Sequence, residues 1–167
     1  MQIPAMLGNE DGHLAIITAI VLMTLLTIIS ISASRVANTE ITMARNDALY
    51  RRNFYLAEGA AIEAADHLTR YGSLLDNRKS WMEMTTGELN LDSVKDYWDH
   101  TAADGDTVIP EPSAVDPNHA FYLIGHEGTA KGFSINMDRP TVHSIAIFGR
   151  CAWNGTSVIQ MGYKAAY

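Results

Sequence analysis

The pattern of apolar and polar positions first singles out residues 14–34. This stretch reads LAIITAIVLMTLLTIISISAS and contains no acidic or basic side chain. At about 1.5 Å per residue, a helix of this length spans roughly 31 Å, which matches the hydrocarbon core of a bilayer. The Thr and Ser hydroxyls can bond back to the helix backbone, so they leave no unpaired polar group in lipid. The pattern predicts a membrane-spanning helix.

A secretory signal peptide and a buried soluble helix are the alternative interpretations of this segment. A signal peptide needs a basic start, whereas residues 1–12 contain no Lys or Arg. A soluble core helix is apolar along one stripe, but this segment is apolar around almost its whole circumference. Both alternatives are therefore disfavoured.

The same helix is predicted to continue to about Tyr71. Residues 35–71 contain no Pro, and Gly59 is the one break in a run of good helix formers. Gly72 then supplies a stop signal. Spacings of three and four place one apolar stripe along the second half of the helix, formed by Phe54, Ala57, Ala61, Ala64 and Leu68. This stripe requires a protein partner rather than lipid.

An acidic connecting region is predicted at residues 72–118. It carries ten acidic and three basic side chains, which account for the formal net charge of −7 of the whole chain. Ser, Asn, Asp and Gly recur throughout it, so we expect loop, with one short helix near Ser93–His100 introduced by a capping pattern that starts at Ser93.

Residues 119–167 have the alternation of β-strands. Strands are expected at 121–125, 132–136, 142–153 and 156–167, and Asn154-Gly155 is a strong signal for a two-residue hairpin. One face of the last strand would carry Ile159, Met161, Tyr163 and Ala165. The fold class is therefore α+β: a long N-terminal helix, transmembrane and then amphipathic, packed through Phe54, Ala61 and Leu68 against a C-terminal antiparallel sheet.

Composition excludes several functions. The acidic balance and the presence of only four Lys argue against nucleic-acid binding, which relies on clustered basic side chains. Cys151 is the single cysteine, so no intramolecular disulfide and no CxxC site can form.

A search for chemistry yields no enzyme and no cofactor. The chain lacks the GxSxG, HExxH, Walker and GxGxxG motifs. Four histidines are too scattered to predict a metal site: His100, His119, His126 and His143. Asp104-Gly105-Asp106, together with Glu111 and Asp116, resembles a calcium-binding loop in composition but lacks EF-hand spacing. A solvated turn is the simpler interpretation. Trp81, Trp98 and Trp153 are expected to pack or to cover the sheet, an exposed adhesive patch being the alternative.

Two segments together resemble the N-terminal domain of PilX-type minor pilins of type IV pili. A short leader ending in NEDG is followed at once by the apolar helix, and an aromatic-rich block, RNFYLAEGAAIEAA at 52–65, follows about forty residues later. The residues that carry the family's helix motif are Asn53, Phe54, Tyr55, Ala57, Glu58, Gly59 and Ala64. The resemblance covers roughly residues 8–70.

The resemblance implies cleavage by the prepilin peptidase between Gly12 and His13, followed by methylation of the new amino terminus. It divides the chain into a leader at 1–12, a long helix at 13–71, the connecting region at 72–118 and a β-sheet head at 119–167. Ile17 stands where major pilins carry a glutamate. The implied function is that of a minor pilin, a structural subunit held in the inner membrane and then integrated among other pilins in a pilus or its tip complex, with no catalytic role.

Orientation and function leave alternatives open. The resemblance places the head on the periplasmic side. The basic residues nearest the span, Arg35, Arg45, Arg51 and Arg52, all follow it, and the positive-inside rule taken alone places the C-terminal part inside. A permanently anchored binding or sensory module, or a type II secretion pseudopilin, would share the same helix.

Overall fold

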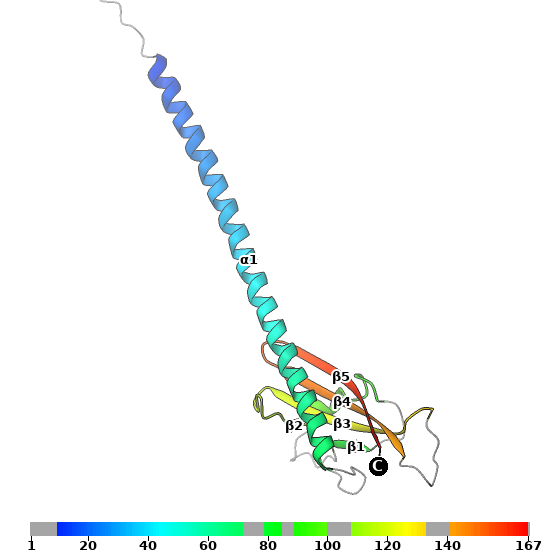
Figure 1. The fold of residues 1–167 in the computed structure, drawn as a ribbon. Coiled ribbons are helices and arrows are strands. Elements are labelled where there is room, and N and C mark those ends of the chain that lie inside the picture. Colours follow the sequence, from blue (N-terminus) through cyan, green and yellow to red (C-terminus); the bar gives the residue numbers. More distant parts are fainter. Residues whose placement is uncertain (1–9, 72–78, 85–88, 100–107, 133–140, 167) are drawn as a thin grey trace, which may run out of the picture. The chain divides into compact units, whose positions relative to one another are not determined.

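The computed structural model describes residues 10–71, 79–84, 89–99, 108–132 and 141–166. Its elements, in chain order, are α1 (Glu10–Tyr71), β1 (Met82–Met84), the 3-10 helix η1 (Asp96–Asp99), β2 (Glu111–Pro112), β3 (Ala120–Thr129), β4 (Val142–Ala152) and β5 (Thr156–Ala166) (Figure 1). The chain forms two compact units, Met1–Asn46 and Asp47–Tyr167, so α1 contributes to both.

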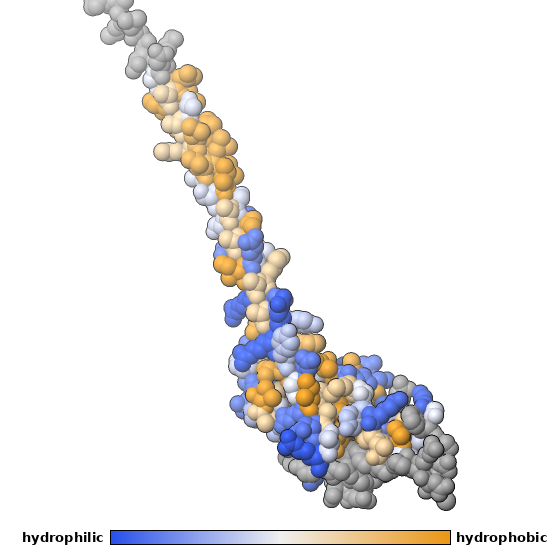
Figure 2. Space-filling view, viewed as in Figure 1, coloured by the Kyte–Doolittle hydropathy of each residue, from blue (hydrophilic) through white to orange (hydrophobic). Residues whose placement is uncertain are grey.

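The predicted long helix is confirmed. Helix α1 is 62 residues long and runs without a break through Gly59 to Tyr71. Within the first unit it is long and apolar enough to cross a membrane, with a mean hydropathy of 2.7 over its most apolar window. Figure 2 shows this apolar surface along the N-terminal part of the helix.

The second unit is built on a mixed sheet. Its strands run in the order β1-β3-β4-β5, and β2 also pairs with β3. The pairs β3–β4 and β4–β5 are antiparallel, as predicted for the long strands. Strand β1 instead pairs with β3 in parallel, with Met82 opposite Ile124, so the expectation of a purely antiparallel sheet is wrong at this edge.

Helix α1 covers one face of this sheet (Figure 1). The helix residues buried there are Ala57, Ala60, Ala61, Ala64 and Leu68, and the strand residues that meet them include Tyr122, Ile124, Ile145 and Ile147. On β5, Met161, Tyr163 and Ala165 pack against the same core. The predicted apolar stripe is therefore confirmed over most of its length.

Phe54 is the exception in the stripe. Its side chain is 40% exposed, whereas the neighbouring Asn53 is only 4% exposed and belongs to the buried face. The expectation that the Phe54 ring packs beneath the sheet is wrong, because the helix face that meets the sheet begins at Asn53, whose side chain bonds to the β4–β5 turn, and Phe54 lies on the adjoining face.

The opposite face of the sheet is covered by residues 89–98. Leu89 and Val94 are buried against Leu123, Ala146 and Phe148, and Tyr97 and Trp98 pack beside them. Part of the region that we expected to be loop thus forms a third layer.

The connecting region also differs from its predicted secondary structure. It contains β1 and β2, and its short helix is η1 at Asp96–Asp99, while His100 lies outside the described residues. The capping box lies one turn earlier than predicted, because the Asn90 amide donates to the Ser93 hydroxyl and the Ser93 amide donates to the Asn90 side-chain oxygen.

The hairpin between β4 and β5 is confirmed, but its loop is longer than predicted. Ala152 still pairs with Thr156, so Trp153, Asn154 and Gly155 form a three-residue connection. Asn154 adopts φ 48° and Gly155 φ 148°, both in the region that favours Asn and Gly. The predicted strand 132–136 lies outside the described residues except for Gly132, which is in a turn.

Candidate functional site

The first candidate surface is the apolar helix of the first unit, 14–34. Its large side chains are all exposed, from Leu14 to Ile31. Its hydroxyls do bond back to backbone carbonyls, as expected: Thr18 to Leu14 at 2.6 Å, Thr24 to Val21 at 2.8 Å, Thr27 to Thr24 at 2.7 Å and Ser30 to Leu26 at 2.8 Å. The helix therefore presents hydrocarbon with these polar groups already satisfied, which suits lipid or another apolar helix.

The second candidate surface is the sequence block at 52–65, which docks α1 on the sheet. Helix and strand approach each other closely at Gly149 of β4. A Cβ atom at Gly149 would overlap the carbonyl oxygen of Ala57 and lie 2.9 Å from the amide nitrogen of Ala61. The small residues of the block therefore let two backbones touch, and any side chain at Gly149 would push them apart.

Asn53 fastens the start of this contact to the β4–β5 turn. Its side-chain nitrogen donates to the carbonyl oxygens of Trp153 at 2.9 Å and Gly155 at 3.3 Å. Its side-chain oxygen accepts a weak bond from the Cys151 thiol, with 3.6 Å between the sulfur and the oxygen. Burial raises the pKa of Cys151, so this thiol stays protonated and suited to donating. The buried amide is thus satisfied at both ends.

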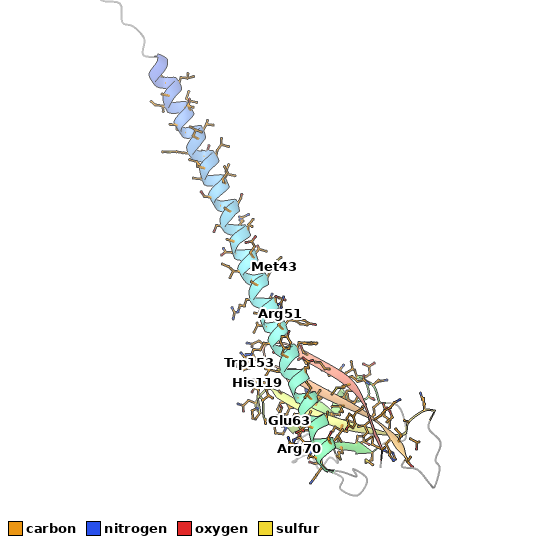
Figure 3. All side chains as sticks on the ribbon, in the orientation of Figure 1. Met43, Arg51, Glu63, Arg70, His119 and Trp153 are labelled. Atoms are coloured by element: carbon orange, nitrogen blue, oxygen red, sulfur yellow. The ribbon has the colours of Figure 1, made fainter. Side chains whose placement is uncertain are left out.

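Arg52, Trp153 and His119 form a stack beside this clamp. The Arg52 guanidinium lies 3.6 Å from the centre of the Trp153 ring. His119 packs on Trp153 with 4.1 Å between ring centroids, and the two residues are close together in Figure 3. His119 Nδ1 lies 3.0 Å from an Asp116 oxygen, and this hydrogen bond is the main reason why the pKa of Asp116 is lowered. The stack links the helix to two loops of the sheet.

Glu63 links the helix to the segment before β3. Its carboxylate accepts a 2.6 Å bond from the buried Ser113 hydroxyl and a 2.9 Å bond from the Ala114 amide. One turn earlier, Gly59 faces the Val115 side chain. A Cβ at Gly59 would lie 3.6 Å from Val115, which is an ordinary contact distance, so packing against Val115 does not require a glycine at this position.

The structure sorts the seven motif residues by face. Asn53, Ala57 and Ala64 are buried against the sheet, and Glu58 and Gly59 are partly buried. Phe54 and Tyr55 point outward and contact each other edge to face, with 5.7 Å between ring centroids. The periodicity of apolar residues did not identify Ala60 and Asn53 as contact residues, although both lie within the block at 52–65.

The predicted processing residues Gly12 and His13 lie within the first turns of α1, which begins at Glu10. His13 is exposed. The proposed leader is described only from residue 10 onward, so cleavage between Gly12 and His13 stays a prediction.

The candidate metal residues do not converge in the described part of the chain. There, no group of three or more His, Cys, Asp and Glu side chains is placed to hold a metal ion. Asp104 and Asp106 of the calcium-like loop lie outside the described residues, while Asp116 pairs with His119. His126 and His143 do meet, with 2.9 Å between ring nitrogens.

The three tryptophans do not form one adhesive patch. Trp81 is buried in the core beneath α1. Trp98 covers the opposite face of the sheet, and Trp153 is at the β4–β5 turn. Packing and covering, the commoner uses of tryptophan, are therefore what the structure contains.

Comparison with known proteins gives one match. Residues 14–61 match the family model described as PilX N-terminal, and this range contains the exposed apolar helix together with most of the docking block. No curated protein and no solved structure matches the chain significantly. The chain therefore carries a PilX-type pilin N-terminal domain, and this family relation indicates a type IV pilin-like role.

Proposed function

We propose that this protein is a minor pilin, held in the inner membrane by residues 14–34 and then built into a type IV pilus, or its tip complex, through the same helix. The observation that carries the proposal is the family match over residues 14–61, which covers the apolar helix and most of the docking block. The family relation favours a structural protein over an enzyme.

The chemistry of the helix supports both stages of this life cycle. A subunit must be stable in lipid before assembly and against other helices afterwards. Its exposed hydrocarbon satisfies the first requirement, and its small residues Ala15, Ala19, Ser30, Ala33 and Ser34 allow close helix approach in the second. Neighbouring pilins are the partners that this surface fits.

Maturation by the prepilin peptidase between Gly12 and His13 is part of the proposal. The mature chain would begin at His13, and the head would face the periplasm and later the outside. Ile17 lacks the carboxylate that major pilins place there, so the subunit would enter the filament without an ion pair at that position. This distinguishes it from a major subunit.

Mass spectrometry of membrane and sheared surface fractions tests the proposal. We expect a chain beginning at His13 in both fractions, and we expect Gly12→Ala to retain the leader and to be absent from sheared filaments. Gly8→Ala, at the other glycine of the leader, serves as the matched control and should be processed normally. Normal processing of Gly12→Ala would refute the cleavage site.

A permanently anchored binding module is the second candidate. The positive-inside rule favours it, because the basic residues nearest the span, among them Arg35 and Arg45, all follow it, which is opposite to the orientation that a pilin needs. In that case the full chain beginning at Met1 would stay in the membrane fraction, and no copy would appear in filaments. A type II secretion pseudopilin would instead be processed and would depend on the secretion machinery.

A further inference from the structure

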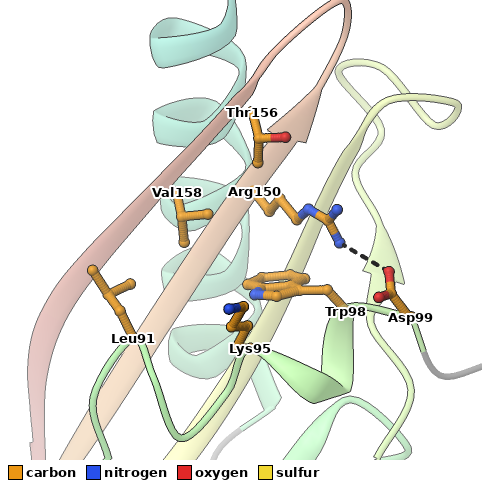
Figure 4. Close-up of a pocket in the computed structure, with 7 residues that line it drawn as sticks. All are labelled: Leu91, Lys95, Trp98, Asp99, Arg150, Thr156 and Val158. Carbon is orange, nitrogen blue, oxygen red and sulfur yellow. Dashed lines mark ion pairs between the residues drawn. The ribbon is translucent and has the colours of Figure 1, made fainter.

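The sheet face opposite α1 contains a cavity of about 350 Å³ (Figure 4). It lies between β4, the edge strand β5 and the segment that covers them. Its lining residues are Leu91, Lys95, Trp98 and Asp99 from the covering segment, Arg150 from β4, and Thr156 and Val158 from β5. The cavity is separate from the docking block and from the apolar helix.

Strand alternation places its floor on this face. In β4, Ile147 packs toward α1, and Phe148 packs toward the covering segment. Arg150 has the same parity as Phe148, and it pairs with Val158 in the sheet register. The covering segment is held above the floor because Leu89 and Val94 are buried against Phe148 and its neighbours.

Arg150 is an anchored cation with hydrogen-bonding capacity in reserve. Its side chain is 23% exposed, and its guanidinium lies 5.7 Å from the centre of the Trp98 ring. One nitrogen lies 3.6 Å from an Asp99 oxygen, but the Asp99 side chain is 87% exposed, so solvent screens this pair. A guanidinium has five N–H donors and matches a carboxylate with two of them.

The other lining groups define what a ligand must offer. Trp98, Leu91 and Val158 supply apolar surface, and Figure 4 shows the Trp98 ring between Arg150 and Lys95. Lys95 is a second cation, so the lining has two positive charges and one negative charge. Thr156 and Asp99 add a hydroxyl and a hydrogen-bond acceptor. The lining therefore fits a ligand with a flat apolar face, a negative charge and hydroxyl groups.

We propose that this cavity binds a carboxylated pyranose, that is, a uronic acid unit of an acidic saccharide. The C–H face of the ring would lie on the Trp98 indole, and the carboxylate would bind Arg150 with Lys95 nearby. Ring hydroxyls would bond to Thr156 and Asp99. A neutral sugar leaves the excess positive charge unmatched, and an aromatic acid offers no hydroxyls to Asp99. The volume fits a small ligand of this kind.

Titration of the full chain in lipid nanodiscs with sodium glucuronate tests this proposal. The tryptophan indole N–H resonances are followed by NMR, and the Trp98 resonance is identified by its loss in Trp98→Phe. We expect a saturable shift of that resonance with a Kd on the order of 1 mM, as is typical for a ligand of about a dozen non-hydrogen atoms. Glucose and benzoate, the neutral and aromatic probes, should each bind at least about tenfold more weakly.

Variants separate the site from general charge attraction. Arg150→Gln should weaken glucuronate binding by about tenfold or more, because it removes a charge-assisted pair. Lys95→Gln, at an exposed position, should weaken it in the same direction without affecting folding. Lys164→Gln is the matched control, since Lys164 has the same parity on β5 as Val158 and Thr156 but lies about 27 Å from Thr156 along the strand. It should leave the affinity unchanged.

Three results would overturn the assignment. The first is no saturable shift of the Trp98 resonance with glucuronate. The second is equal affinity for benzoate or glucose, which would replace a sugar-acid site by a less selective pocket. The third is unchanged binding in both Arg150→Gln and Lys95→Gln, which would place the ligand elsewhere.

Discussion

Substituting Gly149 by alanine tests the docking of α1 on the sheet. An added Cβ would overlap the Ala57 carbonyl oxygen and lie 2.9 Å from the Ala61 nitrogen, and both atoms belong to the helix backbone and cannot rotate away. The helix must therefore move from β4 by about 1 Å, a gap that forfeits a quarter to a half of each dispersion contact along the interface.

The expected cost follows from this displacement. Overpacking of a core costs about 1–3 kcal/mol, and a backbone clash places Gly149→Ala at or above the upper end, at about 3 kcal/mol. For a unit of about 120 residues this lowers the melting temperature by roughly 10 °C. Near-UV circular dichroism of the full chain in detergent follows the loss of packing, because Trp81 lies in the core beneath the helix.

Gly162→Ala is the matched control on the neighbouring strand. A Cβ at Gly162 meets nothing within 4 Å, so we expect a change within about 0.5 kcal/mol. A melting temperature for Gly149→Ala that stays near the wild-type value, as is expected for Gly162→Ala, would refute the close approach of helix and strand. Equal and large losses in both variants would point to a general intolerance of strand glycines instead.

Three further predictions concern single side chains. Asn53→Ala should destabilise the second unit by about 1–3 kcal/mol in chemical denaturation, because two turn carbonyls lose their donor. Phe54→Ala, at the half-exposed neighbour, should cost no more than about 1 kcal/mol. A larger loss for Phe54→Ala than for Asn53→Ala would contradict the assignment of the two residues to their helix faces. Burial and, to a smaller extent, the charge of His143 lower the pKa of His126 in the folded state. As the pH drops below 6.5, the unfolded chain therefore binds a proton at His126 before the folded chain does, and the free energy of unfolding should decrease. His126→Gln should show a weaker decrease over the same pH range. The hydrogen bond to His119 lowers the pKa of Asp116 in the folded state, so the Asp116 carboxylate should stabilise the fold above pH 3.8. This stabilisation should disappear as the pH falls through the lower pKa of the folded state. Asp116→Asn should not show this loss.

The helix and the long strands were predictable because their signals are local and repeated. A charge-free run and an unbroken series of helix formers need no tertiary information, and the alternation in β4 and β5 spans eleven residues in each strand. Which helix positions face the sheet was harder to predict from the sequence. Periodicity assigns Phe54 to the core and ignores Asn53, because an amide is worth burying only when a turn brings carbonyls to it.

Short strands and contacts between residues far apart in the sequence could not be predicted from the alternation of apolar and polar residues. Strands β1 and β2 have three and two residues, too few for alternation to emerge, and each is defined by its partner β3. The three-residue turn at Trp153 depends on the Asn53 bonds and the Arg52 stack as well as on Asn154-Gly155. The Arg150 cavity joins residues about sixty positions apart, so no segment of the sequence displays it.

The proposed function requires residues 14–34 to pack among other pilin helices in a filament. A photo-activatable amino acid in place of Ile28, which is exposed on the apolar helix, tests it in sheared and purified pili. We expect cross-linked peptides that join this helix to the apolar N-terminal helices of other pilus subunits. Cross-links to lipid alone, with the chain confined to the membrane fraction, would contradict it.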